Sequence, residues 1–320
     1  MKEASFLSRY TALSITISVL AVWAKYTFVP EETSTPMLHE PMHSYKVPLF
    51  LTMGYLISLP VLKSMIEVSG VDLRPMLKES MIVYNVAQVI LNVWMVHRFI
   101  AAVGWGGHPF IGDVVTMDKG TTYAMWVHYC NKYLEFLDTY FMVLRGKNDQ
   151  VSFLHVYHHG TIAWAWWIAM CNFPGGDAYF GALLNSWIHV MMYSYYALSL
   201  LKVPCPWKRY LTMAQLVQFL SVVLYTCFCT YLWPVSDRLP QHYMAAGVQV
   251  FEMMSLFFLF QHFYKKSYAK KRKVDDDDQC QAAVASLTTG AGDAVSNLNA
   301  AIGVANKNGP TIVKKHMGPL

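Results

Sequence analysis

Seven apolar stretches dominate this sequence, and each is long enough, or nearly long enough, to cross a lipid bilayer. A transmembrane helix needs about 20 predominantly apolar residues to span the hydrocarbon core. The stretches lie at 46–62, 80–100, 123–144, 153–171, 178–201, 209–232 and 243–264. They predict an all-α polytopic membrane protein with about seven transmembrane helices.

The composition agrees with a chain that is partly solvated by lipid. Hydrophobic residues make up 55% of the 320 residues and charged residues only 14%, whereas soluble proteins carry about 25% charged residues. This balance excludes a disordered protein and argues against an ordinary cytosolic enzyme, which must cover its surface with polar groups. The 47 aromatic residues (20 Tyr, 17 Phe and 10 Trp) fit a protein with side chains at membrane interfaces.

An eighth apolar run, from Ala12 to Val22, precedes the seven stretches. It could be the hydrophobic region of a signal peptide. However, Glu3 stands among the basic residues before it, and no clear small-residue cleavage site follows it. We therefore favour an uncleaved N-terminal helix that lies on or partly in the membrane.

Lysine and arginine alternate between rich and poor connections, as the positive-inside rule requires. The rich segments are 63–79, 145–152, 202–208 and the basic run 265–273, and the poor ones are 101–122, 172–177 and 233–242. With seven spans, this pattern places the C-terminus in the cytosol and the N-terminus in a lumen. The sequence pI of about 8.7 is thus explained by topology and requires no nucleic-acid partner.

The chain divides into three expected parts. Residues 1–45 form a lumenal segment with an interfacial helix, and residues 46–265 form the membrane domain. Residues 266–320 form a cytosolic tail, which is first basic and then carries four acids at Asp275–Asp278 before a stretch rich in Ala, Gly, Asn and Thr. That composition cannot bury a core and predicts disorder after the basic run.

Polar and ionisable residues inside membrane spans are costly, so each is a functional candidate. The third span carries Lys132, Glu135, Asp138 and Thr139 at spacings that put them along one helix face. An ion pair between Lys132 and Glu135 would be a structural explanation, but it cannot neutralise both carboxylates. Asp138 therefore needs a further partner.

The fourth span begins with three histidines that also share a face, His155, His158 and His159. Three imidazoles at helical spacing suit a metal site or a set of bases and nucleophiles. A lone buried histidine is more often structural, but three together inside lipid much less often are.

Three further spans carry polar stripes at helical spacing. They are Asn185, His189, Met192, Tyr193 and Tyr196 in the fifth span, Thr212, Gln215 and Gln218 in the sixth, and Tyr84, Asn85, Gln88 and Asn92 in the second. Counted from the cytosolic ends at 1.5 Å per residue, the polar groups of the third to sixth spans fall roughly 8–18 Å deep. Spans that alternate in direction thus place their polar groups in one layer, which predicts a single polar chamber entered from the cytosol.

Four of these motifs together resemble the ELO family of fatty acid elongases. The matching patterns are K-x-x-E-x-x-D-T from Lys132 to Thr139, H-x-x-H-H from His155 to His159, N-x-x-x-H-x-x-M-Y-x-Y-Y from Asn185 to Tyr196, and T-x-x-Q-x-x-Q from Thr212 to Gln218. They occur in order and cover about 130 to 220. The segment Phe153–His159 and the sequence around His189 look most like the corresponding segments of elongases that accept polyunsaturated chains.

The resemblance implies a very-long-chain 3-oxoacyl-CoA synthase of the endoplasmic reticulum, an acyltransferase that condenses long-chain acyl-CoA with malonyl-CoA and releases CO2 and CoA. The implied fold has seven spans, six of them around a closed-ended acyl tunnel. The implied partners are the two CoA substrates and membrane lipids, with room for a homodimer and for the other enzymes of the elongation cycle. No cofactor, metal or nucleic acid is expected.

No cysteine lies in the motif layer beside a histidine, so a histidine is the available nucleophile. Our hypothesis makes His158 the acyl acceptor, assisted by His189, with His155 and His159 orienting groups, moving protons or stabilising an enolate. Glu135 and Asp138 would set histidine tautomers. The remaining motif residues would bind CoA or support the site: Lys132, Thr139, Asn185, Met192, Tyr193, Tyr196, Thr212, Gln215 and Gln218.

Two other readings remain open at this point. A His-cluster metal-dependent desaturase or hydroxylase needs several clustered histidine motifs, whereas this chain has one cluster among its twelve histidines. A multi-pass lipid transporter or receptor also suits a polar chamber in the membrane, but no inverted repeat is evident.

Overall fold

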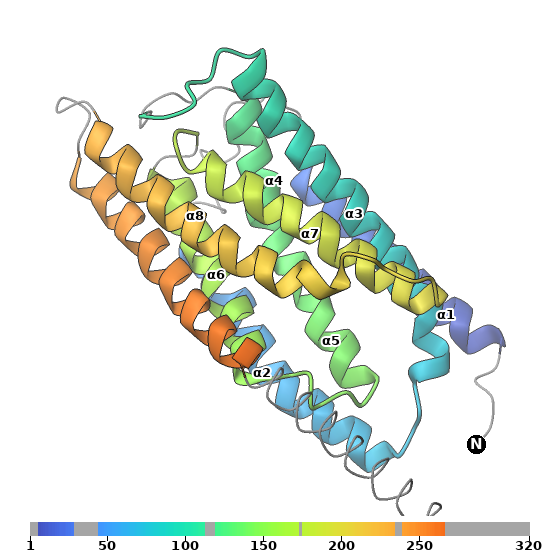
Figure 1. Ribbon diagram of the computed structural model, residues 1–320. Coiled ribbons are helices and arrows are strands. Elements are labelled where there is room, and N and C mark those ends of the chain that lie inside the picture. Colours follow the sequence, from blue (N-terminus) through green and yellow to red (C-terminus); the bar gives the residue numbers. More distant parts are fainter. Residues whose placement is uncertain (1–5, 29–43, 113–118, 173–174, 234–238, 266–320) are drawn as a thin grey trace, which may run out of the picture. The chain divides into compact units, whose positions relative to one another are not determined.

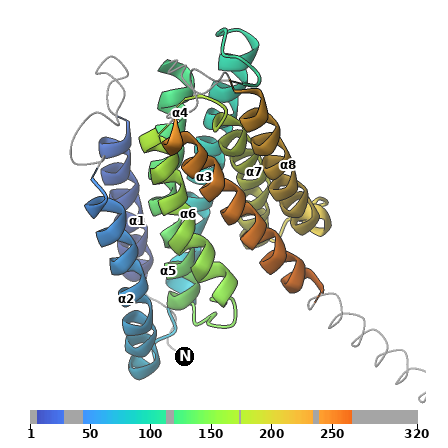
Figure 2. The same ribbon diagram turned by 90° about the vertical axis from the view of Figure 1, so that its left-hand side faces the viewer.

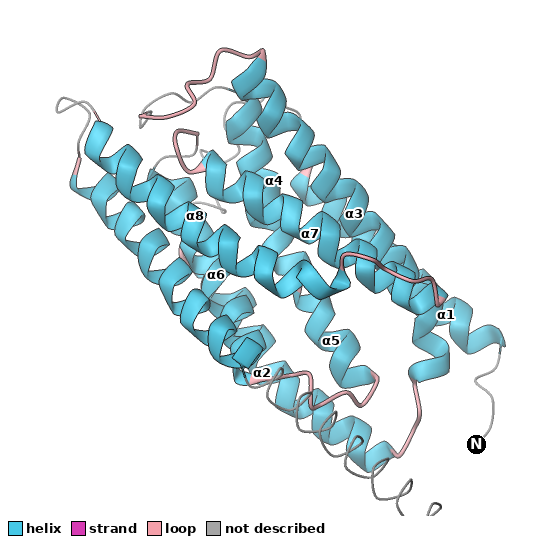
Figure 3. Ribbon diagram, viewed as in Figure 1, coloured by secondary structure: helices cyan, strands magenta, loops and turns pink. Residues whose placement is uncertain are grey.

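The computed structural model describes residues 6–28, 44–112, 119–172, 175–233 and 239–265. The chain divides into two compact units, 1–261 and 262–320, and the description below concerns the first. Apart from a short 3-10 turn, the described elements are helices (Figures 1 and 3). They are α1 (Phe6–Thr27), α2 (Lys46–Ser69), α3 (Arg74–Gly104), α4 (Lys119–Leu134), α5 (Phe136–Leu144), α6 (Phe153–Asn172), α7 (Tyr179–Leu201), the 3-10 turn Lys208–Tyr210, α8 (Leu211–Leu232) and a last helix, Pro240–Lys265.

The fold class predicted from the apolar stretches is confirmed. Four helices are long and apolar enough to cross a membrane by length and composition. They are Lys46–Ser69, Arg74–Gly104, Lys208–Leu232 and Pro240–Lys265. The protein is therefore an all-α polytopic membrane protein.

The helices that contain the first two stretches are longer than predicted. The helix predicted at 46–62 runs to Ser69, where Gly70 ends it in a left-handed conformation, and the helix predicted at 80–100 extends from Arg74 to Gly104. Charged residues such as Lys63 and Glu67 ended the apolar runs, but they do not end a helix. A helix continues past the hydrophobic stretch until a residue such as Gly70 stops it.

The third predicted span, 123–144, is not one continuous helix. α4 ends at Leu134 and α5 begins at Phe136, with Glu135 between them. At this point the Asp138 amide bonds to the Glu135 carbonyl at 3.1 Å, an i to i+3 bond that tightens the turn. A tight turn inside a longer helix often marks a functional site, and here it falls on a candidate site residue.

α4 lies at the centre of the helix packing. Residues 121–132 are all buried, and α4 contacts α3, α6 and α7. α7 packs along α3 on one side and α8 on the other (Figure 1), and α6 lies between α2 and the last helix (Figure 2). Because a helix buried on every side has no access to water, its polar side chains need partners on neighbouring helices.

α1 packs on this central region. It extends beyond the run Ala12–Val22 in both directions and contacts α3 and α4. The Trp23 indole N–H donates to the Cys130 carbonyl at 3.0 Å, and the Trp126 indole N–H donates to the Thr27 carbonyl at 2.9 Å. An N-terminal helix is thus present, and its position relative to the bilayer stays a prediction.

We expect Trp23→Phe to weaken this attachment, because phenylalanine keeps an aromatic ring but loses the N–H donor to the Cys130 carbonyl. The expected loss is about 1 kcal/mol, seen as a lower melting temperature of the detergent-solubilised protein. Tyr26→Phe on the exposed side of α1 is the control and should leave the melting temperature unchanged. Equal melting temperatures for both variants would contradict the role assigned to Trp23.

Candidate active site

Glu135 is the centre of a buried polar cluster, which we call the Glu135 cluster: Asn131, Lys132, Glu135, Asn185 and His189. Lys132 Nζ donates to Glu135 Oε1 at 2.8 Å, and both side chains are 1% exposed. Asn131 Nδ2 donates to the same oxygen at 2.9 Å, and His189 Nδ1 lies 3.0 Å from it. Lys132 Nζ also donates to Asn185 Oδ1 at 2.9 Å. The cluster therefore joins α4 to α7 through one carboxylate oxygen.

Asp138 has a different environment from Glu135. The Tyr193 hydroxyl donates to Asp138 Oδ2 at 2.6 Å, and the Tyr84 hydroxyl lies 3.5 Å from the Tyr193 hydroxyl. The further partner that Asp138 required is thus a tyrosine of α7. Since the His189 and Tyr193 rings are 5.6 Å apart, Asp138 adjoins the Glu135 cluster through Tyr193.

The three histidines of α6 have unequal surroundings. His155 Nε2 lies 2.9 Å from Thr139 Oγ1, which in turn lies 2.9 Å from the Tyr55 hydroxyl. The His155 and His159 rings are 4.5 Å apart and the His158 and His159 rings 5.4 Å. Thr139 and Tyr55 can therefore fix the orientation of His155, which adjoins His159.

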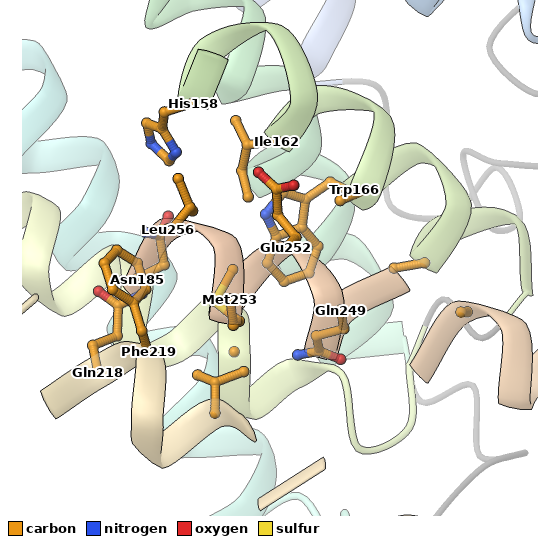
Figure 4. A pocket seen from close by; sticks show the side chains of 15 residues that line it. His158, Ile162, Trp166, Asn185, Gln218, Phe219, Gln249, Glu252, Met253 and Leu256 are labelled. Atoms are coloured by element: carbon orange, nitrogen blue, oxygen red, sulfur yellow. The ribbon is translucent and has the colours of Figure 1, made fainter. Parts of the chain in front are cut away.

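His158 lines a cavity that α6, α7, α8 and the last helix enclose (Figure 4). The space between the lining side chains, including the part that is open to the outside, is about 520 Å³. Asn185 and Gln218 line it together with His158, and most of the other lining side chains are apolar, such as Ile162 and Val222. Asn185 belongs to both the Glu135 cluster and the cavity wall, so the polar chamber and the apolar cavity meet at this residue.

A second cavity of about 210 Å³ lies beside the first one, between the start of α7, α8 and the last helix. Gln249 lines both cavities. At the far end of the second cavity, the Trp233 indole N–H donates to Asp177 Oδ2 at 2.7 Å, and Tyr225 lies in the wall.

Four predicted site residues lie at the margin of these groups. Met192 and Tyr196 pack in an apolar cluster with Tyr84 and Tyr193. Thr212 and Gln215 are half-buried, and neither lines the cavity, whereas Gln218 does. The stripe on α3 is tied largely to its own helix: Gln88 Nε2 donates to the Tyr84 hydroxyl, and Asn92 Nδ2 donates to Gln88.

Sequence reasoning missed four polar residues of the site. Asn131 and Tyr55 contact Glu135 and Thr139, and Gln249 and Glu252 line the cavity from the last helix. A carboxyl group inside an apolar span was a usable signal for Glu252. Asn131 stands next to Lys132 in the chain, but Tyr55 is in a different span and carries no such signal.

Among the described residues, no three His, Cys, Asp or Glu side chains are grouped so that they could hold a metal ion. Five cysteines are described, and all are free, including Cys227 and Cys229, which are two residues apart on α8. The donor sets of this site thus suit hydrogen bonding and proton transfer.

The fold and the site together define a class: a helical membrane protein whose buried histidine and carboxylate cluster adjoins a largely apolar cavity. A sequence model of the family described as "ELO: GNS1/SUR4 family" matches residues 40–276. Because this match covers more than half of the chain, the protein belongs to that family. The expected resemblance is confirmed, and α1 lies outside the matched region.

Curated relatives carry the name very long chain fatty acid elongase 5. The protein of Tachysurus fulvidraco is 39% identical over 198 residues, which are 60% of this chain and 66% of the relative. Those of Rattus norvegicus and Homo sapiens are 39% and 38% identical, and each match covers 60% of this chain and 64% of the relative. The chain thus matches just under two thirds of the length of these relatives.

We expect Glu135→Gln to destabilise the protein severely, because it leaves the buried Lys132 ammonium without its charged partner. Breaking a buried ion pair from one side costs about 3–5 kcal/mol. Thermal unfolding in detergent should show a large fall in melting temperature, and adding Lys132→Met should restore part of it.

The matched control is the exposed pair Lys63–Glu67, whose nitrogen and oxygen are 3.9 Å apart. Glu67→Gln should cost less than about 1 kcal/mol. If Glu135→Gln is as mild as Glu67→Gln, the Glu135 cluster does not have the structural importance assigned to it.

Proposed function

We propose that this protein is the condensing enzyme of fatty acid elongation, which joins a long-chain acyl-CoA to malonyl-CoA to give 3-oxoacyl-CoA, CO2 and CoA. One observation carries the proposal: His158 and Asn185 line an apolar cavity at the point where it meets the buried Glu135 cluster. A nucleophilic side chain at the mouth of a cavity for a hydrocarbon chain is what acyl transfer requires. Membership of the elongase family supports it.

The proposed reaction has two halves that pass through His158. In the first half, a neutral imidazole nitrogen attacks the thioester carbonyl, the C–S bond breaks, and the CoA thiolate leaves and takes a proton. In the second half, malonyl-CoA loses CO2, and the resulting enolate carbon attacks the acyl-imidazole carbonyl. The imidazole leaves with the electron pair of the broken C–N bond, takes up one proton from solvent to replace the one that left with CoA, and is ready for the next cycle.

The other polar residues prepare this reaction. His189 Nδ1 lies 3.0 Å from Glu135 Oε1, and a proton on Nδ1 would leave Nε2 free to accept another, because the two ring nitrogens of a neutral histidine have opposite roles. Lys132 and Asn185 hold Glu135 and the neighbouring wall in place. His155 and His159 lie on the same helix as His158 and can stabilise the enolate or move protons.

We further propose a polyunsaturated acyl chain as substrate and the endoplasmic reticulum as location. The segment Phe153–His159 and the sequence around His189 support the preference for polyunsaturated chains. The alternation of basic connections supports a cytosolic C-terminus and a lumenal N-terminus under the seven-span count. The CoA substrates would then enter from the cytosolic side, where the other enzymes of the elongation cycle are expected to act.

The decisive experiment is to incubate microsomes that contain the full-length protein with acyl-CoA and radiolabelled malonyl-CoA. Labelled 3-oxoacyl or elongated product supports the synthase, and a panel of chain lengths and unsaturations defines the substrate. Absence of product across the panel would overturn the proposal and favour a transporter or receptor. Activity that disappears on chelation would favour the metal-dependent reading.

We expect His158→Ala to reduce condensation at least a thousandfold, since it removes the acyl acceptor. Microsomal product formation and recovery of an acylated peptide that contains residue 158 are the two measurements. His97→Ala on the exposed face of α3 is the control and should retain activity. Acylation found on a residue outside the four site histidines would rule out His-based transfer.

The cavity should also limit chain length. Ala245 is buried in its wall, so Ala245→Phe places a ring where the acyl chain would extend. We expect the ratio of long to short product to fall about tenfold in a mixed acyl-CoA assay. Met244→Phe on the exposed side of the same helix should leave the ratio unchanged, and a shift in both variants would count against this cavity as the acyl site.

A further inference from the structure

Two polar side chains that belong to none of the four motifs face the apolar cavity from the last helix. Glu252 and Gln249 are three residues apart, so they lie on one helix face, and both line the cavity (Figure 4). Their neighbours in the wall are largely apolar, including Met253, Leu256 and Ala245. A carboxyl group and a carboxamide are unexpected in such a wall, because burying polar groups without hydrogen-bonding partners is energetically costly.

The carboxyl group of Glu252 is held in place by α6. The Thr161 hydroxyl donates to Glu252 Oε1 at 2.6 Å and lies 2.8 Å from the Tyr157 carbonyl oxygen. Glu252 is 3% exposed. Among the described residues, none donates a hydrogen bond to Glu252 Oε2, and this oxygen is not fully buried. One oxygen is therefore anchored and the other is available to an occupant of the cavity.

Gln249 is similarly available. No hydrogen bond of its amide to any described residue is found, and its Nε2 lies only 2.8 Å from the position that a Cβ on Gly181 would take. The absence of a side chain at Gly181 thus gives the Gln249 amide its place across the cavity. A purely saturated chain would leave both polar groups without partners, a cost that an occupant with a π bond reduces.

The depth of these groups fixes which part of an acyl chain they would touch. Thr161 follows His158 by three residues on α6, so Glu252 lies about 4.5 Å beyond His158 along the helix axis at a rise of about 1.5 Å per residue. Gln249 lies about one further turn from Glu252, toward the second cavity. The polar pair borders the carbons that follow the thioester, and the methyl end lies deeper.

We propose that Glu252, anchored by Thr161, and Gln249 select acyl chains with a cis double bond close to the thioester over saturated chains and over chains whose double bond lies near the methyl end. The amide N–H groups of Gln249, and the O–H of Glu252 in its protonated form, are donors that can meet the π face of such a bond. This inference rests on the proposed condensing activity and deepens it by assigning the specificity to two residues outside the motifs.

The test compares acyl-CoAs of equal length that are saturated or carry one cis double bond, either near the thioester or near the methyl end. They compete for condensation with labelled malonyl-CoA in microsomes that contain the full-length protein. The wild-type protein should favour the isomer with the bond near the thioester. Glu252→Met keeps the side-chain length but removes the polar group, and it should lower that preference about threefold.

Three further variants separate polarity from packing. Glu252→Gln retains a donor and should keep the preference, whereas Thr161→Val removes the anchor and should lower it. Phe251→Leu changes a neighbouring side chain that is 69% exposed and should have no effect. If Glu252→Met does not accumulate, Thr161→Val decides the question.

An unchanged preference in Glu252→Met or Thr161→Val would overturn the assignment, as would a wild-type protein without positional preference. A shift in Phe251→Leu equal to that in Glu252→Met would also overturn it. Each of these results leaves the condensing activity intact. A wild-type protein that forms no 3-oxoacyl product from any acyl-CoA would instead overturn the proposed function itself, so the two failures are distinguishable.

Discussion

The buried ion pair of Lys132 and Glu135 is the interaction on which the rest of the site depends. Two opposite charges in a membrane interior are tolerated only when they are paired and when their remaining hydrogen-bonding positions are filled. Asn131 of α4 donates to Glu135, and Asn185 of α7 accepts from Lys132. This one ion pair with its hydrogen bonds therefore fixes two helices relative to each other. His189 of α7 lies 3.0 Å from the same carboxylate oxygen, so the packing that satisfies the ion pair also brings a histidine next to it.

The sequence predicted which residues share a helix face, but it could not predict which residues of other helices they contact, because that depends on how the helices pack. Periodicity placed Lys132, Glu135 and Asp138 together, yet the structure separates the two carboxylates, because Tyr193 donates to Asp138 while Lys132 and Asn131 donate to Glu135. The tight turn at Glu135 contributes to this separation. The sequence did not predict this turn, because no proline or glycine lies there. Similarly, Gln215 and Gln218 are one turn apart, and only the packing of α8 against α7 shows that Gln218 reaches the cavity.

Apolar length predicted the helices better than it predicted their ends. A hydrophobic run measures the part of a helix that lipid can cover, whereas α2 continues through Lys63 and Glu67, and α3 already begins at Arg74 and continues to Gly104. The functional residues were predicted from a different feature, the few polar residues inside the apolar runs. This feature identified the site residues of α4 to α8 well, because four motifs lie there. It missed Tyr55 and Glu252, since a single polar residue in a span carries little information until a neighbour such as Thr139 or Thr161 is known.

The division between the motif helices and the last helix suggests how chemistry and selectivity are kept apart. The histidines and the Glu135 cluster lie on α4, α6 and α7, where His155 contacts Thr139 of α5 and Lys132 donates to Asn185 of α7. The last helix contributes no motif residue, yet it supplies five of the residues that line the main cavity, including Glu252 and Gln249. Substitutions on that helix can alter the shape and polarity of the cavity without breaking the buried ion pair. A protein built in this way can change which chain it accepts while the groups that make and break bonds stay in position.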